Sequence, residues 1–205
     1  MKDGDTVGMG GFGIVGIPEN GVFALMDMGV KDLNIVSNLA GTKFTPSSFI
    51  SYLSTTNEFK LELGIAEWGI GLMLKKNQVK AMFASYVGEN PVYEKQYLSG
   101  NIDLNLIPQG TLAEKLRMGA AGVPAFYVKA GVGTYVETGG FPVRLGADGK
   151  SVAKISKPKE RRFFNGRDFL LEEAIKVDYA MAKVCKHHSY IKQTSRRIKL
   201  TIKEI

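Results

Sequence analysis

The segment from Asp3 to Pro18 holds the residues whose types and spacing are best suited to chemistry. It contains six glycines, followed directly by Pro18 and Glu19. Glycines at this density let the backbone adopt positive φ and let a ligand approach the main chain without meeting a Cβ atom. Pro18 suits the first position of a helix, and Glu19 favours the positive end of that helix. The segment therefore predicts a ligand-binding loop that leads into a helix.

One interpretation of this loop is a dinucleotide site. The glycines from Gly8 to Gly13 and from Gly11 to Gly16 both satisfy the G-x-G-x-x-G spacing. A Rossmann site, however, places an acidic residue at the end of the next strand, and Asp32 precedes the apolar run 33–36 instead. An NAD-dependent oxidoreductase that uses the glycine-rich loop is therefore kept as an alternative function.

Helical and strand-like segments alternate after the loop. Apolar residues at helical spacing predict helices, and short apolar runs between turn residues predict strands. The expected helices cover about 18–28, with Gly29 as C-cap, and 68–74, and the expected strands cover 33–37, 79–86 and 103–107. This alternation predicts an α/β fold with an open, mostly parallel sheet and flanking helices.

Turn signals and caps fill in the second half of the chain. A turn at 108–110 should end the third strand, and Thr111 with Glu114 three residues later forms a capping-box pattern that should open a helix. Hairpins are expected around the Asp148-Gly149 turn and the tight turn 163–166. Phe163 and Phe164 are expected in the core.

A set of short motifs together resembles the family I coenzyme A transferases. The first motif is Asp3-Gly4 followed by Gly10-Gly11-Phe12 and Gly16-Ile17-Pro18, although Gly8 stands where the family has an apolar residue. Further motifs are Val36-Ser37-Asn38, Ser85-Tyr86-Val87-Gly88-Glu89-Asn90, Gln96-Tyr97-Leu98-Ser99-Gly100, Pro108-Gln109-Gly110-Thr111-Leu112-Ala113-Glu114 and Gly122-Val123-Pro124-Ala125-Phe126. The resemblance covers residues 3–41 and about 65–183, and it implies the fold of the alpha, or N-terminal, half of a family member.

The resemblance also implies a reaction. Family members of the 3-oxoacid type transfer coenzyme A from succinyl-CoA to a 3-oxoacid such as acetoacetate through a glutamyl-CoA intermediate. Their glutamate lies in a Ser-Glu-Asn-Gly segment of the beta half, and that segment is absent from these 205 residues. We therefore expect no catalytic residue and no permanently bound cofactor here, with the CoA thioester as substrate. The expected partners are acyl-CoA, a carboxylic acid and a beta half or beta subunit, in a homo- or hetero-oligomer.

The same resemblance places this chain on the opposite wall of the active site. Main-chain N–H groups of the loop could stabilise developing negative charge, and neutral side-chain donors suit a carboxylate or thioester oxygen. The implied substrate-binding residues are Gly10, Gly11, Phe12, Gly13, Asn38, Tyr86 and Gln109. Leu39 stands where the family usually has a second asparagine. Three of these residues also have structural interpretations, with Asn38 closing a turn, Tyr86 in the core and Gln109 bracing a loop.

Two regions depart from the family pattern. Residues from about 42 to 64 form an insertion that we expect to be a surface loop within a domain at 1–183. Residues 184–205 form a divergent basic tail, expected to be loose and exposed, which carries +5 of the net charge of +7. A noncatalytic truncated product is therefore a further alternative function.

Composition argues against several other functions. The charge gathers in the tail without an aromatic stacking platform, so nucleic-acid binding is not expected. Cys185, His187 and His188 lack metal-site spacing, so no metal is expected. The chain has no apolar run of about 18 residues, so no membrane span is expected. No targeting segment is recognised, and the expected location is the mitochondrial matrix for a eukaryotic protein and the cytoplasm otherwise.

Overall fold

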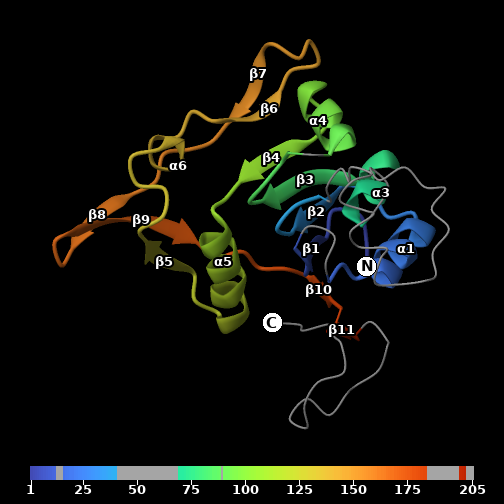
Figure 1. The fold of residues 1–205 in the computed structure, drawn as a ribbon, viewed down its shortest axis with the longest axis horizontal. Coiled ribbons are helices and arrows are strands. Elements are labelled where there is room, and N and C mark those ends of the chain that lie inside the picture. Colours follow the sequence, from blue (N-terminus) through green and yellow to red (C-terminus); the bar gives the residue numbers. More distant parts are fainter. Residues whose placement is uncertain (13–15, 41–68, 89, 184–198, 202–205) are drawn as a thin grey trace, which may run out of the picture.

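A six-stranded sheet forms the centre of the molecule (Figure 1). The computed structural model describes residues 1–12, 16–40, 69–88, 90–183 and 199–201. The strand order is β11-β10-β1-β2-β3-β4, in which β11 is antiparallel to its neighbour and the other five strands are parallel. The strands are β1 (Thr6–Met9), β2 (Leu33–Val36), β3 (Val79–Ala84), β4 (Asp103–Leu106), β10 (Tyr179–Ala182) and β11 (Lys199–Thr201). This confirms the predicted α/β fold with a mostly parallel sheet.

Helices cover both faces of the sheet. They are α1 (Glu19–Met28), α3 (Ile70–Lys75), α4 (Pro91–Leu98) and α5 (Gln109–Ala121). Side chains alternate across each strand, so Ile35 and Met82 join the larger core cluster, which includes residues of α1, α3 and α4. Val36 and Phe83 point to the other face and pack with Leu112 of α5. The two cores fix α5 on one face of the sheet and the other three helices on the opposite face.

The helix starts differ from the sequence expectations. Pro18 is the N-cap of α1 and not its first residue, because its carbonyl accepts the first helical hydrogen bond, from Val22 N at 3.1 Å. The end of α1 is as predicted, since Gly29 is the C-cap with a left-handed φ of 67°.

The predicted capping box is wrong. Helix α5 begins at Gln109, where a turn was expected, because the carbonyl of Pro108 accepts the N–H of Leu112 at 2.9 Å. Thr111 therefore lies inside the first turn, where its buried hydroxyl has no partner among the described residues. Glu114 pairs with Arg117 at 2.7 Å. The earlier start places Gln109 as the first residue of a helix.

Two small antiparallel units project beyond the central sheet, as Figure 1 shows. The first is the order β5-β9-β8, made of β5 (Ala125–Val128), β8 (Arg161–Phe164) and β9 (Arg167–Glu173), and the second is the hairpin of β6 (Pro142–Leu145) and β7 (Val152–Ile155). Both hairpin turns were predicted. Asn165 and Gly166 have φ of 48° and 78°, as a tight two-residue hairpin requires.

The expectation that Phe163 and Phe164 lie in the core is wrong. Phe163 is 65% exposed and Phe164 is 39% exposed, because β8 is an edge strand of the projecting sheet. Phe164 instead makes edge-to-face contacts with Tyr127 and Phe169, at centroid distances of 5.1 and 5.9 Å.

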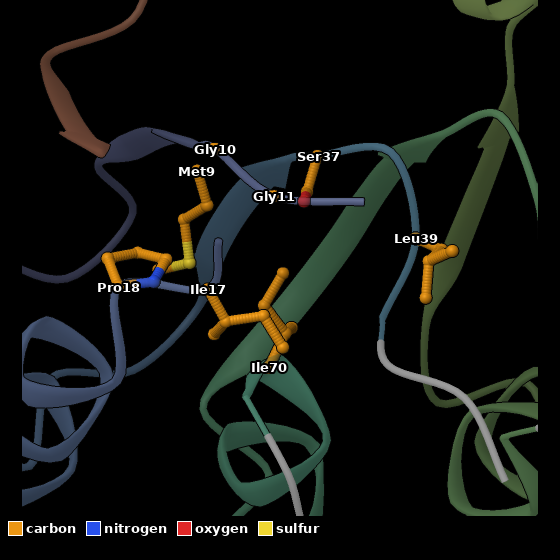
Figure 2. Close-up of a pocket in the computed structure, with 8 residues that line it drawn as sticks. All are labelled: Met9, Gly10, Gly11, Ile17, Pro18, Ser37, Leu39 and Ile70. Carbon is orange, nitrogen blue, oxygen red and sulfur yellow. The ribbon is translucent and has the colours of Figure 1, made fainter. Parts of the chain in front are cut away.

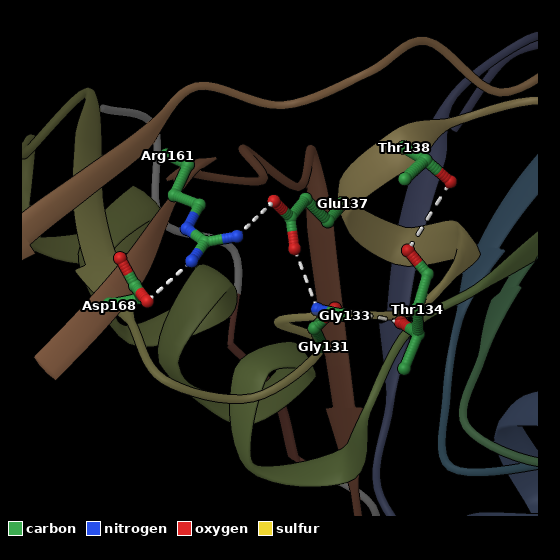
Figure 3. Close-up of polar contacts among 7 residues, drawn as sticks. All are labelled: Gly131, Gly133, Thr134, Glu137, Thr138, Arg161 and Asp168. Atoms are coloured by element: carbon green, nitrogen blue, oxygen red, sulfur yellow. Dashed lines mark hydrogen bonds and ion pairs between the residues drawn. The ribbon is translucent and has the colours of Figure 1, made fainter.

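A charged network holds the glycine turn that precedes α6 (Tyr135–Thr138) against β8 and β9 (Figure 3). The carboxylate of Glu137 accepts the N–H of Gly133 at 2.6 Å and pairs with Arg161 at 3.1 Å. Arg161 also pairs with Asp168 at 2.5 Å. One guanidinium thus ties segment 131–138, which contains the glycine turn and α6, to the edge of the small sheet.

The expected loose tail contributes one strand. Residues 199–201 pair antiparallel with β10, so part of 184–205 belongs to the central sheet. The expected insertion at 42–64 and Trp68, the first residue of the expected helix at 68–74, lie outside the described residues. Gly69 is the N-cap of α3, and Ile70–Lys75 confirms the rest of that helix. Within the described part of the chain, no helix is long and apolar enough to cross a membrane.

Candidate functional site

The candidate site lies where the parallel strands end. Because β1 to β4 run in the same direction, the residues that follow them gather at one edge of the sheet. The peptide N–H of Ser37 donates to the carbonyl of Phe83 at 3.0 Å, and that of Ser85 donates to the carbonyl of Asn38 at 2.9 Å. The chain segments after β2 and β3 are thereby held together, although the strands themselves end earlier.

Asn38 and Gln109 meet at this edge. Asn38 Nδ2 donates to Gln109 Oε1 at 2.8 Å, and the hydroxyl of Ser85 donates to the same oxygen. Asn38 is 8% exposed, and its Oδ1 has no partner among the described residues. Gln109 is exposed and stands at the start of α5. The structure therefore brings two of the predicted site residues into direct contact.

The glycine loop forms a small pocket beside the end of β2 (Figure 2). Its cavity volume is about 10 Å³, roughly the space that one water molecule needs. Gly10 is anchored through its N–H to the carbonyl of Met181 at 2.9 Å, and Gly11 has a φ of 125° that favours glycine. The pocket is lined by Met9, Gly10, Gly11, Ile17, Pro18, Ser37, Leu39 and Ile70.

The remaining predicted site residues lie differently. Phe12 is 72% exposed, so its ring extends from the loop into solvent. Tyr86 is 48% exposed, so the alternative that it is a core residue is wrong. Its hydroxyl oxygen lies close to Gly88, where an added Cβ atom would stand 2.6 Å from it. Gly13 lies outside the described residues. Within the described part of the chain, the hydroxyl of Tyr86 forms no hydrogen bond with the Asn38–Gln109 pair.

Sequence reasoning missed several residues of the site. Ser85 belongs to one of the family-like motifs, but nothing in the spacing of that motif shows that its hydroxyl reaches Gln109. Ile17, Leu39 and Ile70 contribute apolar side chains to the pocket from three separate segments. Hydrophobic periodicity marks such residues as buried but cannot show that they line a cavity.

The chemistry of this edge is that of neutral donors. The described residues that line the pocket carry no charged side chain, and the adjoining polar groups are two amides and hydroxyls. Such groups can bind an anionic or carbonyl oxygen without acting as competing bases. The arrangement can therefore hold a carboxylate or thioester, whereas none of these side chains is suited to form an acyl anhydride.

Comparison with known proteins identifies the class. The model of the family described as "Coenzyme A transferase" matches residues 1–197, and the chain therefore belongs to this family. A solved structure of an acyl-CoA transferase apoenzyme from Escherichia coli O157:H7 has the same fold, with a TM-score of 0.62 and 21% identity over 88% of this chain and 31% of the other. Glutaconate coenzyme A-transferase from Acidaminococcus fermentans gives a TM-score of 0.54 and 16% identity over 88% of this chain and 51% of the other.

Two relatives with higher sequence identity are both named as one type of coenzyme A transferase. The human mitochondrial succinyl-CoA:3-ketoacid coenzyme A transferase 2 is 46% identical over 183 residues, which cover 89% of this chain and 31% of the relative. A probable succinyl-CoA:3-ketoacid coenzyme A transferase subunit from Bacillus subtilis (strain 168) is 40% identical over 186 residues, which cover 91% of this chain and 60% of the relative. The chain thus spans about a third of the human relative and less than two thirds of the bacterial one. The predicted family resemblance is confirmed.

Proposed function

We propose that this chain is the alpha half of a 3-oxoacid CoA-transferase, which moves coenzyme A from succinyl-CoA to a 3-oxoacid such as acetoacetate. The observation that carries this proposal is the Asn38–Gln109–Ser85 cluster beside the glycine loop. The chain that holds it is 46% identical to the human succinyl-CoA:3-ketoacid coenzyme A transferase 2. A partner beta half supplies the glutamate that forms the glutamyl-CoA intermediate.

The pocket supports a division of the site between two halves. At about 10 Å³ it cannot enclose a substrate carboxylate, and it has the character of one wall of a larger site. In this proposal Gly10, Gly11, Phe12 and Gly13 face the reacting carboxyl, and Asn38, Tyr86 and Gln109 bind its oxygens. The bacterial relative is named as one subunit of its transferase, which implies a second subunit for that protein and supports a two-part assembly here.

Other parts of the proposal concern ligands and location. The CoA thioester is a substrate, consistent with the solved thioester complex of the Escherichia coli transferase with CoA, and no permanent cofactor is needed. The human relative is named as mitochondrial, so we place this chain in the mitochondrial matrix if its source is eukaryotic. We also propose that 1–183 is the alpha-type domain, with an inserted loop at about 42–64 and a divergent tail at 184–205.

The test is CoA transfer from succinyl-CoA to acetoacetate, measured for this chain alone, for a separately produced beta half from a close relative, and for their mixture. The proposal predicts activity only in the mixture. Activity of this chain alone would contradict the proposal that the glutamate lies in the beta half. A folded chain that is inactive in every combination would support the noncatalytic alternative.

A further inference from the structure

Gln109 has an amide whose two ends differ in chemistry. Its Oε1 can only accept hydrogen bonds and its Nε2 can only donate them. Which end faces a ligand therefore decides whether this residue attracts or repels a carboxylate. The proposed function requires the donor end to face the substrate, so the orientation of this amide matters for binding.

Two donors converge on Oε1 of Gln109. Asn38 Nδ2 lies 2.8 Å from it, and the Ser85 hydroxyl donates to it as well. Nε2 makes no hydrogen bond to another described residue, and the side chain is exposed. Because Oε1 is held by two donors and the side chain is exposed, Nε2 is left available to donate to a group outside the described residues.

The surroundings of Asn38 show what this orientation costs. Asn38 is buried, yet its Oδ1 has no partner among the described residues. A buried acceptor without a partner is unfavourable. If the Asn38 amide alone were turned over, its oxygen would face Oε1 of Gln109 and the two acceptors would repel each other. The unsatisfied oxygen is therefore the consequence of keeping Nδ2 directed at Gln109.

We propose that Ser85 is a positioning residue that acts together with Asn38 to fix the amide of Gln109, so that Nε2 donates to an oxygen of the bound carboxylate or thioester. The part that concerns the substrate rests on the proposed function. The part that concerns the amide orientation is a property of this chain alone. Ser85 itself touches Gln109 and need not touch the substrate.

The orientation is tested by hydrogen exchange of side-chain amides, followed by NMR on the full ¹⁵N-labelled chain. Spectra of Asn38→Asp and Gln109→Glu assign the two NH₂ groups. We expect the NH₂ of Asn38 to be protected and that of Gln109 to exchange at the rate of an exposed amide. Protection of the Gln109 NH₂ would overturn the proposal, because both amides would then be turned over with Oε1 facing the site.

The role of Ser85 is tested by activity in the mixture with a beta half. Ser85→Ala should raise KM for the acceptor carboxylate about 3- to 10-fold, the effect of one hydrogen bond, with a smaller change in kcat. Ser85→Thr keeps the hydroxyl and should restore KM to within about 2-fold of the parent chain. Ser99→Ala removes a hydroxyl that donates to the carbonyl of Gln96 at 3.2 Å, away from the site, and it serves as the matched control.

The outcomes separate the two proposals. An inactive mixture containing the unmodified chain would count against the proposed function, while the exchange experiment would still decide the orientation of Gln109. An unchanged KM in an active Ser85→Ala mixture would overturn the positioning role. A rise in KM in Ser85→Thr equal to that in Ser85→Ala would also overturn it, because the hydroxyl would then not be the group that matters.

Discussion

Asn38 and Gln109 are 71 residues apart in the chain, and their amides are joined by a hydrogen bond of 2.8 Å. The bond links the turn after β2 to the first residue of α5, which follows the outermost strand β4. It therefore spans the position of β3, whose following residue Ser85 contributes the third member of the cluster. The orientation of this cluster depends on how α5 and the loop after β2 are anchored.

Leu39 is the residue of the pocket where a new donor should change activity. Its side chain is 9% exposed and lines the pocket beside the Asn38–Gln109 pair. Leu39→Asn places a second amide there, and we expect kcat/KM in the mixture with a beta half to rise about 3- to 10-fold, as one added hydrogen bond allows. The buried amide should also lower the free energy of unfolding by about 1–3 kcal/mol.

Leu39→Ala is the matched control for this change, because it opens space without supplying a donor. Steady-state kinetics with acetoacetate should show a gain for Leu39→Asn only. An equal gain in Leu39→Ala would mean that space limits the reaction, and no gain in either would refute the proposed contact.

Gly119 permits the close approach of α5 to the segment after β9. A Cβ atom at this position would lie 2.0 Å from the carbonyl oxygen of Ile175, a backbone atom that cannot rotate away. Gly119→Ala should therefore lower the free energy of unfolding by about 1–3 kcal/mol, through overpacking. Urea denaturation monitored by circular dichroism measures this difference.

Gly110, in the first turn of the same helix, provides the comparison. A Cβ atom there would meet no described atom within 4 Å, so Gly110→Ala should be neutral or stabilising by up to about 1 kcal/mol through helix propensity. An equal change in unfolding free energy for Gly119→Ala and Gly110→Ala would contradict the close packing of α5 at Gly119.

Glu172 is a buried carboxylate shared by two lysines. Its side chain is 1% exposed, and it lies 2.8 Å from Lys115 Nζ and also pairs with Lys159. Lys115 Nζ donates to the carbonyl of Glu173 at 2.6 Å as well. Glu172→Gln leaves two cations without their partner, and we expect a loss of about 3–5 kcal/mol in unfolding free energy.

The neighbouring exposed Glu173 gives the control, since Glu173→Gln should stay within about 0.5 kcal/mol of the parent chain. Chemical denaturation at neutral pH compares the two variants. If both variants lost a similar small amount of unfolding free energy, the two lysines would not depend on the charge of Glu172.

Arg161 should make the stability of segment 131–138, which contains the glycine turn and α6, depend on pH. The N–H of Gly133, together with Arg161, lowers the pKa of Glu137, and the Arg161 side chain lowers the pKa of Asp168. A lowered pKa in the folded state means that stabilisation is present above the unfolded value of about 4 and is lost as the pH falls through the lower folded value.

We therefore expect the chain to be more stable than the double variant Glu137→Gln, Asp168→Asn at pH 7, with a difference that shrinks as the pH falls below about 4. Urea midpoints at pH 7 and at pH 3 measure it, and added salt should reduce the difference at pH 7 because the ion pairs are partly exposed. If the stability difference between the chain and the double variant grew as the pH fell, the network would not stabilise the folded chain as described.

The sequence could predict the elements that depend on local signals. The strands 33–37, 79–86 and 103–107 follow from apolar runs, and the C-cap Gly29 follows from a glycine placed after the last apolar residues of a helix. The structure has these elements within one or two residues. The start of α5 was missed because a capping-box pattern at Thr111 and Glu114 competes with a proline that can itself accept the first helical bond. Local patterns do not decide between two such starts.

The site was only partly predictable for a different reason. The resemblance indicated Asn38 and Gln109 separately, but their contact depends on strand order, which brings the ends of β2, β3 and β4 together. The exposed Phe163 and Phe164 show the same limit, because an aromatic pair in a strand has no sequence signal that distinguishes a projecting edge from the core.

The central claim is that this chain supplies binding groups and that the covalent intermediate forms elsewhere. Its most direct test is intact-protein mass spectrometry after brief incubation of the chain and a separate beta half with succinyl-CoA, without acceptor. We predict a mass increase equal to covalently bound coenzyme A on the beta half only. The same increase on this chain would contradict the claim, since it would place the nucleophile among these 205 residues.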